Sequence, residues 1–153
     1  MHHTVNFTTQ IRSMTANDLP SVIKLAEQLG YPVSIGSLTE HFIRVSSESD
    51  HALFVIENQT RVLGYAHVFK YYSLTRGPNA QLAAIVVDEA CRGQGLGKSL
   101  MAKVELWSLS KGLGSVWLST QTKRETAHRF YQGLGYGKQK SSFVFGKNLS
   151  LEK

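Results

Sequence analysis

Hydrophobic periodicity divides the chain into ten segments of regular structure. Alternating apolar residues or short β-branched runs predict strands over residues 7–13, 52–57, 62–72, 81–87, 115–120 and 142–146. Apolar residues at three- and four-residue spacing predict helices over about residues 19–29, 37–46, 95–110 and 124–134. The resulting order β-α-α-β-β-β-α-β-α-β predicts an α/β fold with a mixed sheet and helices on both faces.

Local signals mark the ends of several segments. Thr15 precedes Asp18 at the spacing of a capping box, which predicts the start of the first helix. Turns are predicted at residues 58–60 and 76–79, between the strands that flank them. No repeat, linker or low-complexity segment divides the chain, so residues 1–153 are expected to form a single domain.

The composition is that of an ordinary globular protein, with 42% hydrophobic and 18% charged residues. We expect neither a membrane span nor a signal peptide, because no apolar run is long enough for either. Cys91 is the single cysteine, which excludes an internal disulfide framework and favours a reducing, cytoplasmic location. The net charge of +6 is spread along the chain, so we expect no nucleic-acid or membrane partner, although it suits a polyanionic cofactor.

A glycine-rich stretch follows the apolar strand at residues 81–87. Gly93, Gly95 and Gly97 let the backbone turn sharply at the start of the helix over residues 95–110. The first amides of a helix lack intrahelical acceptors, and the helix dipole favours negative charge there. Strand, glycine loop and helix start together predict an anion-binding cradle, which most often holds a phosphate.

Two common nucleotide-binding motifs do not fit this stretch. A P-loop requires a glycine at the position of Arg92, although Gly97-Lys98-Ser99 matches its tail. A Rossmann fingerprint requires a third glycine where this chain has Lys98 or Leu100. On this stretch alone, the alternative is a glycine-rich turn that binds no ligand.

A third interpretation fits without a mismatch. Arg92-x-x-Gly95-x-Gly97 after a hydrophobic strand resembles the acetyl-CoA pyrophosphate loop of the GCN5-related N-acetyltransferases (GNAT). Residues 127–136, Ala-His-Arg-Phe-Tyr-Gln-Gly-Leu-Gly-Tyr, resemble the A-x-x-F-Y-x-x-x-G-[FY] signature of the same superfamily. The resemblance implies the GNAT fold, with a mixed, mostly antiparallel sheet of about six to seven strands, and acetyl-CoA as cosubstrate.

A narrower likeness involves residues 118–131 and the pattern Phe143-x-Phe-x-Lys-x-Leu149. Both are similar to aminoalkylphosphonate N-acetyltransferases, which acetylate small amines that bear a phosphonate. The implied activity is transfer of an acetyl group to a primary amine of a small molecule, by direct attack in a ternary complex. The implied partner is this amine, no metal is implied, and a homodimer is left open.

The resemblance also implies which residues form the site. Backbone groups of Ile85, Val86 and Val87 are expected to hold the pantetheine, and an N–H near Val86 or Val87 to stabilise the oxyanion. Tyr131 is the expected proton donor to the CoA thiolate, with a free pKa of about 10 against about 8.5 for a thiol; the alternative is a packing role beside Phe130. The remaining cofactor contacts implied are Arg92, Gly93, Gln94, Gly95, Leu96, Gly97, Lys98, Ser99 and Arg124, together with Tyr131.

Two positions depart from the family pattern. Ala84 stands where relatives often carry an acidic residue that helps to deprotonate the amine, so the base is left open. Arg124 stands where many relatives carry Asn, and it could contact a CoA phosphate, an anionic substrate or only solvent. Candidate bases are Asp88, Ser119, Thr120, His67 and His128, while Phe69, Tyr71 and Tyr72 could wall the amine site.

Two other functions remain open on the sequence. The chain could acetylate the N-terminus of a protein or peptide. It could also be a CoA-binding sensor without catalysis, which the missing acid at Ala84 favours, whereas Tyr131 favours an enzyme. Cys91 is not required in any of these functions, because a neutral amine can attack the thioester directly.

Overall fold

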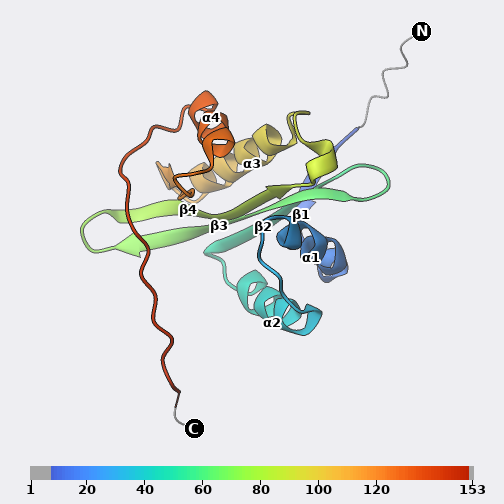
Figure 1. Ribbon diagram of the computed structural model, residues 1–153, viewed down its shortest axis with the longest axis horizontal. Coiled ribbons are helices and arrows are strands. Elements are labelled where there is room, and N and C mark those ends of the chain that lie inside the picture. Colours follow the sequence, from blue (N-terminus) through green and yellow to red (C-terminus); the bar gives the residue numbers. More distant parts are fainter. Residues whose placement is uncertain (1–7, 152–153) are drawn as a thin grey trace. The chain divides into compact units, whose positions relative to one another are not determined.

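The computed structural model describes residues 8–151. They fall into two compact units, divided between Leu118 and Ser119. The first unit contains the sheet with α1, α2 and α3, and the second contains α4 and an extended segment (Figure 1). In chain order the elements are β1 (Gln10–Ser13), η1 (Ala16–Asp18), α1 (Leu19–Gln28), α2 (Ile35–Ser46), β2 (His51–Glu57), β3 (Val62–Ser73), β4 (Gly77–Val87), η2 (Glu89–Cys91), α3 (Leu96–Ser110), β5 (Val116–Trp117) and α4 (Glu125–Gly133).

The strands of the described residues form one sheet in the order β1-β2-β3-β4-β5. The first four strands are antiparallel neighbours, and β5 runs parallel to β4. This confirms the mixed, mostly antiparallel sheet, although residues 8–151 supply five strands rather than six or seven. The first predicted strand begins at Gln10 in the structure, and Phe7 lies outside the described residues.

The predicted strand at residues 142–146 is wrong. These residues lie in extended chain that belongs to no strand. The side chains of Phe143, Val144 and Phe145 are 89%, 94% and 92% exposed. β-Propensity describes how a residue fits a paired, half-buried surface, so it yields a strand only where a neighbouring strand supplies the hydrogen bonds.

The ends of β4 and β5 also differ from the prediction. β4 begins at Gly77, so the turn predicted over residues 76–79 is partly strand. Pro78 is tolerated there because it lies near the first residue of the strand, before β5 begins to pair with β4. β5 is limited to Val116–Trp117 and does not extend over residues 115–120.

Helices cover opposite faces of the sheet in the first unit, as predicted (Figure 1). On one face, Leu100 and Val104 of α3 are fully buried in a cluster with Ala66 and Val68 of β3. On the other face, α1 and α2 pack against β2 around Val55. Because strand side chains alternate, each residue of β3 and β4 belongs either to the α3 face or to the α1–α2 face.

An ionic clamp ties the start of α1 to the sheet. Arg12 in β1 donates to both oxygens of the Asp18 carboxylate at 2.8 Å and to Glu57 in β2 at 2.9 and 3.0 Å. Asp18 also accepts from the N–H of Thr15 at 2.7 Å, which confirms the predicted capping box. The hydrogen bonds from Arg12 are the main cause that lowers the pKa of Asp18. The clamp positions α1, whose last residue, Gln28, donates to the Asp88 carboxylate and accepts from the N–H of Glu89, between β4 and the glycine loop.

Gly64 in β3 lies where two strands and α3 meet. A Cβ at this position would stand 2.6 Å from the carbonyl oxygen of Val86 and 3.3 Å from Cγ2 of Ile56. Gly64→Ala therefore forces β3 and β4 apart, and we expect the free energy of unfolding, measured in urea, to fall by about 2 kcal/mol. Gly36→Ala in α2 is the matched control, since nothing lies within 4 Å of its Cβ. Equal stability of the two variants would contradict this packing.

Candidate functional site

β4 and β5 separate soon after they pair. β5 is hydrogen-bonded to β4 only at Ala80 and Gln81, whereas β4 continues to Val87. From Leu82 onward, the edge of β4 on the β5 side therefore has no paired strand among residues 8–151. The predicted pantetheine residues lie along this open edge: Ile85, Val86 and Val87.

A β-bulge lies at the beginning of the open edge. His67 of β3 stands opposite Ala84, and Val68 stands opposite Leu82, which leaves Ala83 without a partner. A bulge bends the strand that carries it and increases its twist. The bulge therefore coincides with the point where β4 and β5 part.

The glycine loop connects the open edge to α3. Gly93 and Gly95 have φ values of +79° and +81°, a conformation that L side chains rarely adopt. Gly95 is the N-cap residue of α3 and has no side chain with which to cap it. The N–H of Ser99 donates to the carbonyl oxygen of Gly95 at 3.1 Å, so the amides before it have no acceptor inside the helix.

The side chains of the loop are arranged around these amides. Leu96 is 7% exposed and anchors the helix start in the core. Arg92 donates from Nε to the carbonyl oxygen of Val87 at 3.3 Å. The structure thus brings all eight predicted pyrophosphate residues into one loop and helix start, from Arg92 to Ser99. Their binding of a pyrophosphate stays a prediction.

Asp88 braces the loop. Its carboxylate accepts hydrogen bonds from Arg61 at 2.5 Å, from the N–H of Ala90 at 3.2 Å and from Gln28 at 3.4 Å. The hydrogen bond from Arg61 is the main cause that lowers the pKa of Asp88. Because these donors occupy both of its carboxylate oxygens, Asp88 is suited to holding the loop rather than to deprotonating an amine.

A cavity of about 410 Å³ lies beside the loop. Arg61, Cys91, Gln94 and Leu96 line it, so one of its walls is the glycine loop and the start of α3. Arg61 also donates to Sγ of Cys91 at 3.4 Å, which places the single cysteine in a structural contact.

His67 stands opposite Ala84 of β4, on the strand edge away from the open one. Its side chain is on the α1–α2 face, because its neighbours in β3 belong to the core under α3. Its Nε2 is 2.9 Å from Nδ1 of His51, and His51 stacks on Phe69 with ring centroids 5.2 Å apart. Burial, together with the neighbouring His51, lowers the pKa of His67 to about 4. His67 is therefore neutral at pH 7, as a proton acceptor must be.

The three aromatic residues predicted to wall the amine site do not all lie on one face of the sheet, because side chains alternate along β3. Phe69 and Tyr71 lie on the same face as His67, whereas Tyr72 lies on the α3 face.

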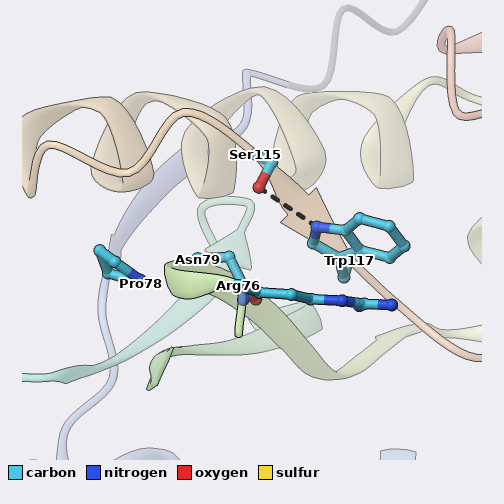
Figure 2. Close-up of a pocket in the computed structure, with 5 residues that line it drawn as sticks. All are labelled: Arg76, Pro78, Asn79, Ser115 and Trp117. Atoms are coloured by element: carbon cyan, nitrogen blue, oxygen red, sulfur yellow. Dashed lines mark hydrogen bonds between the residues drawn. The ribbon is translucent and has the colours of Figure 1, made fainter. Parts of the chain in front are cut away.

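A second cavity, of about 260 Å³, lies at the start of β4 (Figure 2). The sequence pattern missed this cavity because residues 76–79 read as a turn. Its lining residues are Arg76, Pro78, Asn79, Ser115 and Trp117.

In the second unit, Arg124 is the N-cap residue of α4 and Tyr131 lies within this helix. The Tyr131 ring contacts the rings of Phe130 and Tyr136, with centroids 5.1 and 6.0 Å away. Burial raises the pKa of Tyr131, and the charge of Arg124 opposes this shift. Tyr131 therefore keeps its proton at neutral pH, which is required of a group that protonates a thiolate.

The other candidate bases of the second unit have different surroundings. His128 has its Nε2 2.9 Å from the carbonyl oxygen of Gln121, so this nitrogen carries the proton and donates it. Ser119 and Thr120 follow β5 and do not belong to it. A role for any of the three in proton transfer stays a prediction.

Among residues 8–151, no group of three or more His, Cys, Asp or Glu side chains is arranged to hold a metal ion. Within the same range, no helix combines the length and the apolar character needed to cross a membrane.

The sequence matches the model of the acetyltransferase (GNAT) family over residues 16–136, and the chain belongs to this family. It is 33% identical over 87 residues to the uncharacterized N-acetyltransferase YhdJ of Bacillus subtilis, and 34% identical over 74 residues to the thialysine N-epsilon-acetyltransferase of Bos taurus. The two alignments cover 57% and 48% of this chain, and 61% and 44% of the relatives. The chain thus spans about half the length of the curated relatives it matches.

A solved structure shows the same fold. The aminoglycoside N-acetyltransferase AAC(6')-Iy in complex with CoA matches with a TM-score of 0.85 and 20% identity, covering 97% of this chain and 100% of that chain. At this identity the likeness shows the fold alone, and it confirms the GNAT fold. The family match confirms the resemblance carried by the two motifs, and acetyl transfer from acetyl-CoA to amines is general to that family.

Proposed function

We propose that this protein transfers the acetyl group of acetyl-CoA to a primary amine of a small molecule. The observation that carries the proposal is the arrangement at the end of β4. There the open strand edge at residues 85–87 leads into the glycine loop and the uncapped start of α3. An extended amide chain can add to an open strand edge, and a pyrophosphate can bind the free amides of a helix start. Acetyl-CoA carries both groups.

The cofactor contacts follow from this arrangement. The amides of residues 93–98 bind the pyrophosphate, because the N–H of Ser99 already donates to Gly95, and Arg92 and Lys98 add positive charge beside it. Pantetheine lies along Ile85, Val86 and Val87. The N–H of Val86 or Val87 donates to the thioester carbonyl oxygen, where negative charge develops as the amine attacks. On the family resemblance, Arg124 and Tyr131 complete the cofactor contacts.

The reaction is a direct displacement. The neutral amine nitrogen attacks the thioester carbon, a C–N bond forms, and the C–S bond breaks as the tetrahedral oxyanion collapses. The amine loses one proton, and the CoA thiolate gains one. Tyr131 is proposed to supply the proton that the CoA thiolate gains, by the family resemblance and because it is protonated at neutral pH.

His67 is the acceptor that the geometry favours for the amine proton. It is neutral and stands opposite Ala84, where the common acidic residue is missing. With a pKa of about 4 it does not hold a proton at pH 7. It is therefore proposed to pass the proton on, through His51 at 2.9 Å, rather than to store it.

A CoA-binding sensor without catalysis is the second candidate. The observation that favours it is Ala84, because no carboxylate replaces the missing acid on this strand. Acetylation of a protein or peptide N-terminus would use the same chemistry on a larger acceptor. The three functions predict different rates of thiol release from acetyl-CoA when small amines or peptides are supplied as acceptors.

Thiol release from acetyl-CoA tests the proposal. The protein is incubated with acetyl-CoA and small primary amines, and with N-terminal peptides as a separate set. We expect at least one small amine to raise thiol release above the rate without acceptor, with a saturable dependence on its concentration. Binding of acetyl-CoA without acceptor-dependent release would favour the sensor, and release with peptides alone would favour the N-terminal acetyltransferase.

A further inference from the structure

We propose that the cavity at the start of β4 binds an anionic oxygen group of the acceptor, which is a carboxylate, phosphate or phosphonate, and so selects amines that carry one. This inference rests on the proposed acetyl transfer and names the chemical class of its acceptor. The cavity has a volume of about 260 Å³, and all of its lining residues belong to the first unit (Figure 2).

The cavity is formed where β4 and β5 begin to pair. The N–H of Ala80 donates to the carbonyl oxygen of Ser115 at 3.0 Å, and Ala80 and Val116 pack in the core under α3. Because side chains alternate along a strand, Asn79 and Ser115 belong to the opposite face of the sheet. Since the sheet fixes their backbones, these polar groups are positioned before a ligand binds.

Asn79 lines this cavity and carries an unused donor. Its side chain is buried, with 3% exposure, although it is polar. Its Oδ1 accepts a hydrogen bond from Nε2 of Gln81 at 2.9 Å, which leaves its Nδ2 as the free end of the amide. Among residues 8–151, Nδ2 has no hydrogen-bond partner. Leaving a buried donor unpaired is costly, so a ligand that offers an oxygen acceptor is stabilised here.

Arg76 supplies the charge. Its guanidinium carbon stands 4.5 Å from the centroid of the Trp117 ring, and Figure 2 shows the two side chains beside each other. Within the described chain, Arg76 takes part in no salt bridge. Stacking fixes the plane of a guanidinium and leaves its N–H groups free to bind two oxygens at once.

Ser115 completes a set of donors. Its Oγ accepts from Nε1 of Trp117 at 3.2 Å, so its own hydroxyl proton is free to be donated. None of the lining residues is acidic. One cation and two neutral donors around a small cavity match an oxyanion and disfavour a cationic or purely apolar group.

The position of the cavity matches an acceptor subsite. Asn79 is two residues before Gln81, which is the last β4 residue paired with β5 before the open edge begins. Two residues of strand span roughly 7 Å. Asn79 also shares its sheet face with His67 and Phe69. A small molecule can therefore place its amine at the open edge and its anionic group in the cavity.

Matched pairs of acceptors test the selectivity. Primary amines that end in a carboxylate or phosphonate are compared with amino alcohols of equal chain length, at constant ionic strength. We expect the KM of the anionic amine to be lower by roughly tenfold or more. Arg76→Gln should raise that KM by a similar factor and change the KM of the amino alcohol much less. Arg44→Gln, which alters an exposed arginine of α2, is the control and should keep the selectivity.

A binding measurement tests the cavity without catalysis. Trp117 and Trp107 are the only tryptophans, so Trp107→Phe leaves Trp117 as the fluorescent reporter. Inorganic phosphate, titrated against chloride at equal ionic strength, should change its emission in a saturable way. Arg76→Gln and Asn79→Ala, each in the Trp107→Phe background, should weaken or abolish the change.

The outcomes separate this inference from the proposed function. Equal KM values for charged and neutral amines in the parent protein, or emission that does not respond to phosphate, would overturn the subsite. Acetylation of no amine at all, with acetyl-CoA still bound, would overturn the proposed function, and the cavity would then not be an acceptor subsite. A phosphate response together with preference for anionic amines supports both.

Discussion

Replacing Tyr131 by Phe is expected to lower kcat for amine acetylation by roughly 10²-fold, while the Kd of acetyl-CoA changes little. The substitution removes only the hydroxyl, so the ring contacts with Phe130 and Tyr136 remain. Without this donor, the CoA sulfur must leave as an unprotonated thiolate. Steady-state kinetics give kcat, and titration calorimetry gives the Kd, so a loss of chemistry is separated from a loss of binding.

The pH profile gives a second readout of Tyr131. Burial raises its pKa above the usual value of about 10. A raised pKa means that the acid form persists across neutral pH and is lost only in strongly alkaline solution. The parent kcat should fall there, and Tyr131→Phe should lack that fall. Tyr72→Phe, on the α3 face of β3, is the control; if Tyr131→Phe keeps the same kcat as this control, Tyr131 has no part in the mechanism.

Replacing Ser99 by Asp is expected to weaken acetyl-CoA binding by roughly tenfold or more without loss of stability. Ser99 is exposed in the first turn of α3. A carboxylate there interacts favourably with the helix dipole and stabilises the helix by about 0.3–1 kcal/mol. The same carboxylate repels a pyrophosphate at the uncapped amides. Stability and affinity should therefore change in opposite directions, which partial unfolding could not produce.

Ser99→Asn is the matched control, because it has nearly the same size without the charge. Titration calorimetry gives the Kd of acetyl-CoA for both variants, and thermal melts give their stability. The difference in Kd should shrink as ionic strength rises, since salt screens an exposed charge. If Ser99→Asp binds acetyl-CoA as tightly as Ser99→Asn, the pyrophosphate does not lie at this helix start.

The glycine loop could be predicted from the sequence because its determinants are local. Gly93 and Gly95 adopt left-handed backbone that few other residues tolerate, and this requirement is visible as glycine in the sequence. The spacing of apolar residues along α3 predicts its buried face, which contains Leu100 and Val104. The same reasoning explains why the order of helices and strands was largely right up to β5 and α4.

The errors concern features that depend on a partner strand. Residues 142–146 have strand-forming side chains, but propensity does not supply the neighbour that a strand needs. The 2.9 Å contact between His51 and His67 arises from the register of β2 and β3, which no local pattern determines. Similarly, the turn signal of Arg76-Gly77-Pro78 concealed the strand that carries Asn79.

One signal for the cavity at the start of β4 was nevertheless present in the sequence. Asn79 and Gln81 are polar residues that alternate with Ala80 and Leu82, as expected for a strand with one polar face. Ser115 and Trp117 show the same spacing across Val116. Polar alternation in two neighbouring strands therefore indicates a shared polar face, even where turn residues interrupt the first of them.

Amide chemical-shift mapping during titration with acetyl-CoA tests most directly whether the loop after β4 holds this molecule. We predict saturable shifts at the amides of residues 93–99 and at Val86 and Val87 in the parent protein, and much weaker shifts at the same amides in Ser99→Asp. No saturable shifts, or shifts confined to residues away from β4 and the start of α3, would contradict the proposed binding of acetyl-CoA.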